Sequence, residues 1–382
     1  MIVFFYDFPL RENQRRPLHA ILCKALILVV LLTTACSTTE EIVDPISEDS
    51  RLPTGTAESV DLIPYYLENA LSQISAAEDH KLHSMLVVRN GVLVVEEYYN
   101  GYGRDNPHDI RSATKSITSL LTGIALERGF LTDVDSPLMN YLSAAYPGVS
   151  DKDDITIHHL LSMQSGLDCD DSDLRTRGQE DRMYRSEDWV EYFLSLTKPY
   201  TPGEITRYCT GGVVALGEAI AQSSGMDAAY FSDRFLFSAL GIENYRWARF
   251  KNDQKVDTGG HLLLTPQAMA KIGMLVYQNG MWNGQQIVSP QWLDISTRPH
   301  TEIGTVPYGY LWWSDIARFG EKEVQVLYAS GNGGQTIFVV PEYDLVTVFT
   351  AGYYNSEKSR IVFELFGNAV LPSISELQDH LN

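Results

Sequence analysis

A serine and a lysine three residues apart, Ser112 and Lys115, are the first candidates for chemistry in this chain. Residues i and i+3 share one face of a helix, so the two side chains would be neighbours if a helix begins at Ser112. A partly desolvated lysine loses its proton more readily and can help to deprotonate a serine hydroxyl. The pair predicts a nucleophilic serine. The alternative is an N-cap serine followed by a surface lysine.

The same spacing occurs a second time, at Ser195 and Lys198, and the surrounding residues separate the two pairs. Pro199 follows Lys198 directly, which predicts that Ser195 ends a helix and that Lys198 leads into a loop. Residues 112–128 instead carry apolar side chains at a helical period. The first pair therefore opens a long helix and is the better candidate.

Tyr208 lies in a short segment before the apolar run that begins at Val213. A tyrosine at such a position can act as a general base or relay a proton if a nearby cation lowers its pKa. The alternative is a packed tyrosine with a satisfied hydroxyl group.

A glycine-rich segment, residues 329–335, separates two strand-like runs in the last quarter of the chain. Glycine at a strand edge marks a bulge or a close approach of another backbone. A ligand lying along this strand would be held by backbone N–H groups, and the alternative is a tight turn. The candidate substrate-binding residues here are Ser330, Gly331 and Gly333.

Helical periodicity and turn signals predict the elements that must position these residues. Asn90-Gly91 between two β-rich runs predicts a hairpin. Strand-like runs follow near the C-terminus, with short turns that favour antiparallel pairing. Helices are expected over 61–76, 112–128, 155–163, 186–196 and 212–223, after Thr265, and near 357–370; strands are expected over 308–313, 324–328, 336–340 and 345–350. The layout predicts an α+β fold in which the first hairpin joins the last strands in one antiparallel sheet, flanked by helices, with a mostly helical region inserted.

Charge and the N-terminal segment bear on partners and location. The 382 residues carry 29 Lys+Arg against 49 Asp+Glu, a net charge of -20, which disfavours nucleic acid as a partner. Basic residues, an apolar run and small residues up to Cys36 predict a signal peptide over 1–36, with a plain membrane anchor as the alternative. Residues 37–57 have the composition of a flexible tether. One large domain is expected over 58–382.

Cys169 and Cys209 remain after the predicted signal. An oxidising compartment allows a disulfide between them. Spacing alone leaves two free buried thiols as an equal alternative.

The serine-lysine pair, the tyrosine loop and the glycine-rich strand occur in an order that resembles the serine β-lactamase and penicillin-binding-protein superfamily. The likeness is to its class C β-lactamase-like branch, which includes esterases, D-aminopeptidases and nylon-oligomer hydrolases. Further segments look like that branch: residues 155–167, 260–266, 281–284 and 308–313. The resemblance covers roughly residues 60–370.

This resemblance implies a β-lactamase/transpeptidase-like fold and a role for each candidate. Ser112 would form an acyl-enzyme, Lys115 would share its proton, and Tyr208 would protonate the leaving group and activate water. The backbone N–H groups of Ser112 and Asn332 would form the oxyanion hole. The resemblance implies no cofactor, and no HExxH or paired-cysteine metal motif is present.

Two positions depart from the family pattern. Thr210 replaces a frequent asparagine and is a candidate substrate contact, and Ala329 replaces a cation that helps β-lactamases bind a carboxylate. The Tyr-Cys-Thr sequence looks more like the nylon-oligomer hydrolase and esterase side. A bond between Cys169 and Cys209 would then tie the tyrosine loop to a neighbouring loop.

The predicted function is a serine hydrolase of the carboxylesterase or amidase type, which acts on an ester, an amide or a D-amino-acid peptide bond. Its partner would be a small molecule or a short peptide. The signal also resembles that of a bacterial lipoprotein, which would anchor Cys36 to the membrane on the periplasmic side of the cell envelope. The alternatives are a catalytically silent envelope protein that binds cell-wall peptide and a true β-lactamase. The oligomeric state stays open.

Overall fold

An eight-stranded antiparallel sheet joins the two ends of the chain, in the order β10-β11-β12-β13-β14-β15-β1-β2. The computed structural model describes residues 51–149 and 151–380. The strands are β1 (Leu82–Arg89), β2 (Val92–Tyr98), β10 (Thr301–Ile303), β11 (Val306–Tyr308), β12 (Trp313–Phe319), β13 (Lys322–Gly331), β14 (Gln335–Val340) and β15 (Leu345–Ala351). The first strand pairs with the last, with Leu86 opposite Val348, which confirms that the N-terminal hairpin completes the C-terminal sheet.

The turn of this hairpin forms at Asn90-Gly91, as expected. Both residues have positive φ, 51° and 78° respectively, which is the backbone conformation that a type I′ turn requires. β1 is buried along nearly its whole length, whereas β2 alternates between half-buried and buried residues over 92–95 and has no buried residue after that. This difference arises because β1 lies between two other strands and β2 lies at the sheet edge.

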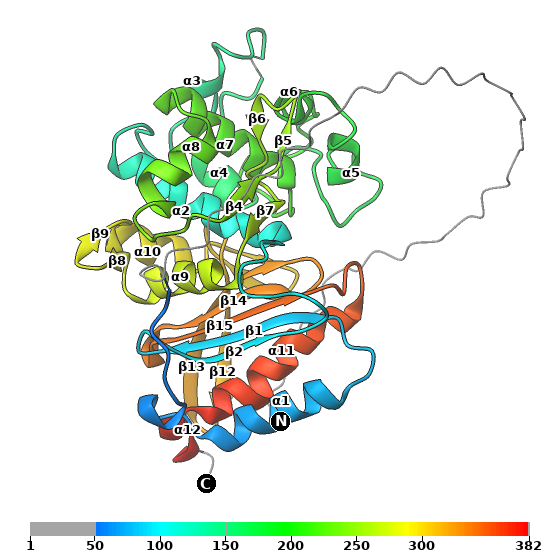
Figure 1. Cartoon of the computed structure of the whole chain (residues 1–382). Helices are drawn as coiled ribbons and strands as arrows, with labels where there is room; N and C mark the ends of the chain where they lie inside the picture. Colours follow the sequence, from blue (N-terminus) through cyan, green and yellow to red (C-terminus); the bar gives the residue numbers. More distant parts are fainter. Residues whose placement is uncertain (1–50, 150, 381–382) are drawn as a thin grey trace, which may run out of the picture.

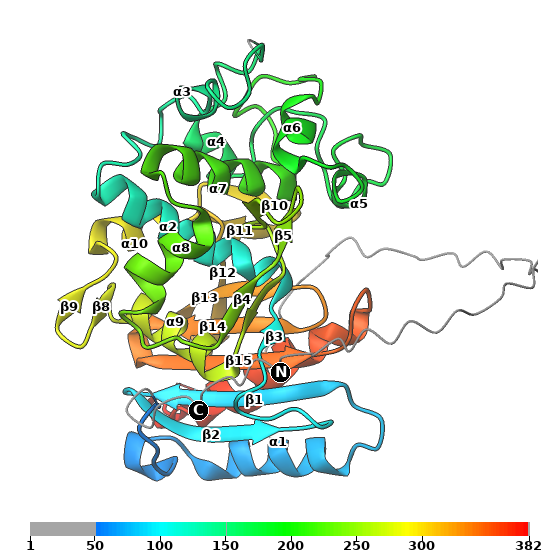
Figure 2. The same cartoon turned by 45° about the horizontal axis from the view of Figure 1, so that its top comes forward.

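Helices cover both faces of the sheet (Figures 1 and 2). On one face lie α1 (Pro64–Ala76) and the C-terminal helices α11 (Ile361–Leu365) and α12 (Ser375–Gln378). On the other face α9 (Pro266–Tyr277) packs against β1, β14 and β15. The Thr265 side chain caps α9 by accepting the N–H of Ala268, as the sequence predicts.

The inserted region between β2 and β10 is mostly helical and sits above the sheet (Figure 1). Its helices are α2 (Thr114–Glu127), α3 (Met139–Leu142), α4 (Ile157–Leu161), α5 (Glu180–Met183), α6 (Trp189–Leu194), α7 (Thr210–Ser224), α8 (Ala228–Ser232), α9 and α10 (Pro290–Thr297). Short strands form three small sheets: β3 (His108–Asp109), β7 (Leu262–Leu264) and β4 (Tyr245–Trp247) in one, β5 (Arg249–Phe250) with β6 (Lys255–Val256), and β8 (Met281–Trp282) with β9 (Gln285–Gln286).

Two expected elements differ from the structure. Residues 308–313 do not form one strand, because Leu311 has a φ of 64° and its N–H donates to the carbonyl of Leu161. The expected terminal helix over 357–370 is broken into a 3-10 turn, α11 and a π-helical turn.

The signal peptide over 1–36, including Cys36, lies outside the described residues, as does most of the expected tether. Within residues 51–149 and 151–380, no helix is both long and apolar enough to cross a membrane.

Candidate active site

Ser112 lies in a 3-10 turn (Arg111–Ala113) that runs directly into α2. Backbone N–H groups in a first helical turn have no intrahelical acceptor and can bind developing negative charge. The end of β13 passes close to this turn: a Cβ added to Gly331 would lie 2.2 Å from the carbonyl oxygen of Ile110. Glycine is therefore required for the strand to approach the serine this closely.

Lys115 is buried, with 1 % of its surface exposed, and its ammonium group has three partners. The Nζ atom lies 3.1 Å from Ser112 Oγ, 3.0 Å from Thr210 Oγ1 and 2.6 Å from the carbonyl oxygen of Gly259. These contacts fix the lysine beside the serine hydroxyl. The expected pairing of the two side chains on one side of the helix is present.

The second Ser-x-x-Lys match is placed as the sequence predicts. Ser195 follows the last residue of α6, and its hydroxyl donates to the carbonyl of Tyr192. Lys198 forms an ion pair with Asp154. Ser195 therefore contacts its own helix end, and Lys198 pairs with a carboxylate.

Tyr208 converges on the same serine from the other side. Its hydroxyl is hydrogen-bonded to Ser112, and the Lys115 Nζ lies 5.0 Å from the centre of its ring. The ring stacks on Trp313 at a centroid distance of 5.9 Å. Burial raises the pKa of Tyr208, whereas the charge of Lys115 and the hydrogen bond to Ser112 lower it. The net rise keeps the phenol protonated at neutral pH in the free protein.

The serine opens to a cavity of about 550 Å³. Apolar side chains form part of its wall: Ile303, Val306, Trp313 and Phe363. Charged and polar groups form the rest, among them Asp170, Glu180, Arg207, Glu357 and Arg360. A second cavity of about 260 Å³ shares Ser112 and Asn332 with the first. The serine thus lies where two cavities meet, so groups on either side of a scissile bond could be accommodated.

The glycine-rich strand contributes most, but not all, of its expected residues to the lining of the larger cavity. Ser330, Gly331 and Asn332 line the larger cavity. The Asn332 side chain exchanges hydrogen bonds with Asn355, which holds the strand end in place. Gly333 points elsewhere: its carbonyl accepts the N–H of Tyr353, and its φ of 99° requires glycine. Gly333 is not among the residues that line the two cavities beside Ser112, so its expected substrate contact stays a prediction.

Thr210 does not line either cavity, which corrects the expectation that it contacts substrate. Its side chain is fully buried at the start of α7. The hydroxyl accepts a hydrogen bond from Lys115 at 3.0 Å and donates to Asp171 Oδ2 at 2.7 Å. Thr210 thus links Lys115 to a buried carboxylate, because its short side chain points inward at the helix start.

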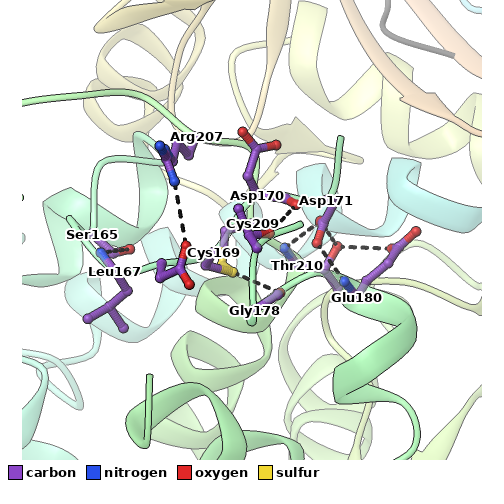
Figure 3. The surroundings of a disulfide bond; sticks show 12 residues. Ser165, Leu167, Cys169, Asp170, Asp171, Gly178, Glu180, Arg207, Cys209 and Thr210 are labelled. Atoms are coloured by element: carbon purple, nitrogen blue, oxygen red, sulfur yellow. Dashed lines mark hydrogen bonds and ion pairs between the residues drawn. A yellow bond between two sulfur atoms is a disulfide. The ribbon is translucent and has the colours of Figure 1, made fainter. Parts of the chain in front are cut away.

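The disulfide between Cys169 and Cys209 is formed, with a Cα–Cα distance of 5.5 Å. Figure 3 shows it beside Thr210 and Asp171. Cys209 stands between Tyr208 and Thr210 in the chain, and the N–H of Asp171 donates to the carbonyl of Tyr208 at 2.8 Å. The bond therefore ties the tyrosine segment to the neighbouring loop, and the alternative of two free thiols is excluded.

Two buried carboxylates near Lys115 were not among the expected site residues. Burial raises the pKa of Asp171 to about 7, helped by the nearby charge of Glu180 and opposed by Lys115. Asp257 is fully buried, and burial raises its pKa as well. The sequence signal at Asp171 is slight, since an acidic loop residue is usually solvated. Nothing near Asp257 in the sequence marks it.

The remaining departure from the family pattern lies in the sheet. Ala329 is fully buried in β13, opposite Ile337 of β14. Its methyl group supplies no charge at the position where the resemblance leads one to expect a cation. In the described part of the chain, no group of three or more His, Cys, Asp or Glu residues could hold a metal ion.

Comparison with known proteins identifies relatives of this architecture. A 6-aminohexanoate-dimer hydrolase from Paenarthrobacter ureafaciens is 22 % identical over 294 residues, which cover 69 % of this chain and 71 % of the relative. A Bacillus anthracis structure, provisionally assigned as a 6-aminohexanoate-dimer hydrolase, superposes with a TM-score of 0.68 at 20 % identity, covering 86 % of this chain and 88 % of the other. Simvastatin synthase from Aspergillus terreus superposes with a TM-score of 0.64 at 16 % identity, covering 82 % of this chain and 98 % of the other.

The family model described as Beta-lactamase matches residues 68–362. That span includes Ser112, Lys115, Tyr208 and the glycine-rich strand. The family and the relatives of this chain indicate the serine hydrolase superfamily. The expected fold is confirmed, and this chain belongs to the beta-lactamase family.

Proposed function

We propose that this protein is a serine hydrolase that cleaves an ester, an amide or a D-amino-acid peptide bond through an acyl-enzyme on Ser112. One observation carries the proposal: two proton-carrying groups converge on one hydroxyl. Lys115 Nζ lies 3.1 Å from Ser112 Oγ, and Tyr208 is hydrogen-bonded to the same residue. Such an arrangement of a nucleophile with adjacent proton acceptors is what acyl transfer needs.

In the first step Lys115, in its neutral amine form, takes the proton of Ser112 while Ser112 Oγ bonds to the carbonyl carbon; Tyr208 remains a phenol that can donate. The carbonyl oxygen becomes an oxyanion, for which the backbone N–H groups of Ser112 and Asn332 are the candidate donors. Collapse breaks the bond to the leaving group, which takes the proton from the pair. Water then attacks the acyl carbon with the same transfers, and the acid and Ser112 are released.

The cavity supports a small substrate with both apolar and polar parts. Its wall combines Ile303, Val306, Trp313 and Phe363 with charged groups, and its volume of about 550 Å³ lies within the range of small-molecule sites. Relatives described as 6-aminohexanoate-dimer hydrolases make a linear amide one of the first compounds to test. The apolar Ala329 disfavours a β-lactam, because the cation that would hold its carboxylate is replaced by a methyl group.

A fluorophosphonate serine label and four substrates test the proposal. The substrates are p-nitrophenyl butyrate, 6-aminohexanoate dimer, D-alanine p-nitroanilide and a chromogenic cephalosporin. We expect labelling of the wild type, no labelling of Ser112→Ala, and turnover of the butyrate ester. Labelling that survives in Ser112→Ala would show that the nucleophile is another residue. A wild type that neither labels nor turns over any of the four would favour a silent binding protein.

A further inference from the structure

Asp257 is a fully buried carboxylate next to the site, and it organises a short loop. It accepts the backbone N–H groups of Gly259 and Gly260, each at 3.0 Å, and the Nδ1–H of His261 at 2.9 Å. Hydrogen bonds to an ionised acceptor are roughly twice as strong as neutral ones. The loop from Asp257 to His261 is therefore held in one shape by its own first residue.

This loop delivers a carbonyl group to the catalytic lysine. Gly259 O lies 2.6 Å from Lys115 Nζ, the shortest of the three contacts of that ammonium group. The loop is also pressed against α7: a Cβ added to Gly259 would lie 2.7 Å from Thr210 Cγ2. The position of Gly259, and hence of Lys115, depends on the shape that Asp257 imposes.

The same loop reaches the residue that precedes the nucleophile. Because His261 donates from Nδ1 to Asp257, its Nε2 is free to accept from Arg111 Nη1, which lies 2.7 Å away. Arg111 has a φ of 52°, a left-handed conformation that is unfavourable for a non-glycine residue. The Asp109 carboxylate also accepts the backbone N–H of Arg111 and forms an ion pair with the Arg111 guanidinium group. His261 and Asp109 together hold this conformation.

The charged and titratable groups around His261 come from four elements. Asp257 lies on its own loop, Asp109 on β3 and Arg111 on the nucleophile turn. The ring of Tyr184, just after α5, lies 5.5 Å from the imidazole ring. The hydrogen bond to Asp257 raises the pKa of His261, and Arg111 lowers it. Protonation at Nε2 would put a donor against the Arg111 donor and break their contact.

We propose that Asp257 and His261 are positioning residues, which fix Lys115 through the Gly259 carbonyl and fix the Ser112 turn through Arg111. The hydrogen bonds of the two side chains join the loop and Arg111, and His261 also lines the smaller cavity beside Ser112. Their effect is on geometry, so it falls on the rate of acylation rather than on substrate affinity. The inference rests on the proposed function, because it assigns these residues to the same reaction.

Two substitutions at His261 separate positioning from bulk structure. Glutamine carries an amide NH2 donor group and a carbonyl acceptor, so it can replace both the donor and the acceptor of neutral His261, whereas leucine has a similar size and neither group. With p-nitrophenyl butyrate at pH 8.5, we expect His261→Leu to lower kcat about 10- to 100-fold with little change in KM, since small displacements of catalytic groups have effects of this size. We expect His261→Gln to retain most of the activity. Asp257→Asn should lower kcat as His261→Leu does, and Asp227→Asn, at the start of α8, is its control.

A double-mutant cycle adds a readout that does not depend on one variant alone. Arg111→Met removes the same contact from the other side, together with the Asp109 ion pair, so the double variant with His261→Leu should lose less than the sum of the two single losses. Additive losses, or a His261→Leu variant with unchanged kcat, would overturn the inference while wild-type activity upholds the proposed function. A wild type without turnover or labelling would overturn both.

Discussion

At the scale of single residues, Lys115 is distinguished by its surroundings rather than by its motif. The chain carries two Ser-x-x-Lys pairs, and only the first is buried against a tyrosine and a cavity. The lysine of the second pair forms an ion pair with Asp154. This contrast supplies matched controls for the catalytic assignment.

We expect Lys115→Met to lower kcat/KM by about 10,000-fold or more, because removal of one member of a catalytic unit eliminates most of its effect. Lys198→Met removes the lysine of the second pair and should leave ester hydrolysis close to wild type. Steady-state kinetics with p-nitrophenyl butyrate give the comparison. Equal losses in the two variants would mean that the first pair has no special role.

Tyr208 has a matched neighbour in Tyr308, whose ring centre lies 6.3 Å away. We expect Tyr208→Phe to lower kcat by about 100- to 10,000-fold, the usual effect of losing a general acid or base. Within the described residues, the buried hydroxyl of Tyr308 has no hydrogen-bond partner. Tyr308→Phe should therefore leave activity intact and not reduce the unfolding temperature. A Tyr208→Phe enzyme with normal kcat would remove Tyr208 from the mechanism.

At the scale of elements, α7 connects the disulfide, the tyrosine and the lysine. Cys209 precedes Thr210, the first residue of the helix, and Asp171 Oδ2 accepts the Thr210 N–H at 2.8 Å. A carboxylate at a helix N-terminus is favoured by the helix dipole. The helix start, the disulfide and the neighbouring loop therefore form one connected unit (Figure 3).

Removal of the disulfide should loosen this unit. The two cysteines are 40 residues apart, for which the chain-entropy relation gives about 4 kcal/mol of stabilisation. We expect Cys169→Ser/Cys209→Ser to lose stability of this order in urea unfolding and to lose kcat more than KM. Dithiothreitol should reproduce both losses in the wild type and have no effect on the double variant. Reduction that leaves stability and kcat unchanged would contradict this role.

Asp171 should make stability depend on pH. Burial raises its pKa to about 7 in the folded protein, against 3.8 for a free aspartate side chain. Between these values the folded state binds more protons than the unfolded state, so stability falls as pH rises from about 4 to 7. Asp171→Asn lacks this titration. The free energy of unfolding of the wild type, relative to the variant, should fall between pH 5 and pH 8 by about 1 to 4 kcal/mol. A difference independent of pH in urea titrations would contradict the raised pKa.

At the scale of the whole molecule, the fold brings together residues that are distant in the sequence. Lys115 meets Thr210 across 95 positions and Gly259 across 144 positions. The β1–β15 pairing closes the sheet, and the inserted helical region places α2 and α7 above it (Figures 1 and 2). Ser112, Lys115 and Tyr208, the proposed catalytic groups, lie at the junction of the sheet and this region, where β13 ends beside the Ser112 turn.

We also propose that the whole molecule is anchored to the membrane of the cell envelope through Cys36. The support is the order of basic, apolar and small residues before this cysteine. In a bacterial host that lipidates such proteins, the wild type should incorporate radiolabelled palmitate and sediment with membranes. Cys36→Ser should lose the label. A wild type that stays unlabelled, or a Cys36→Ser variant that keeps the label, would contradict lipidation at this residue.

Much of the fold follows from local sequence. The Asn90-Gly91 hairpin and the helix that begins after Thr265 are both present, because turn and cap preferences act over a few residues. The prediction of one strand over residues 308–313 was wrong, because tertiary contacts turn the backbone at Leu311. Strand-forming composition alone cannot reveal such a contact.

The sequence by itself determined the residue types that could react, their order along the chain and the family they resemble. Only the tertiary structure decided that Thr210 faces Lys115 and Asp171 instead of substrate, and that Cys169 bonds to Cys209. It also decided that Asp257 is buried beside the site. The physical reason is that burial, side-chain direction and pKa depend on groups brought together from distant parts of the chain, and no local pattern records those contacts.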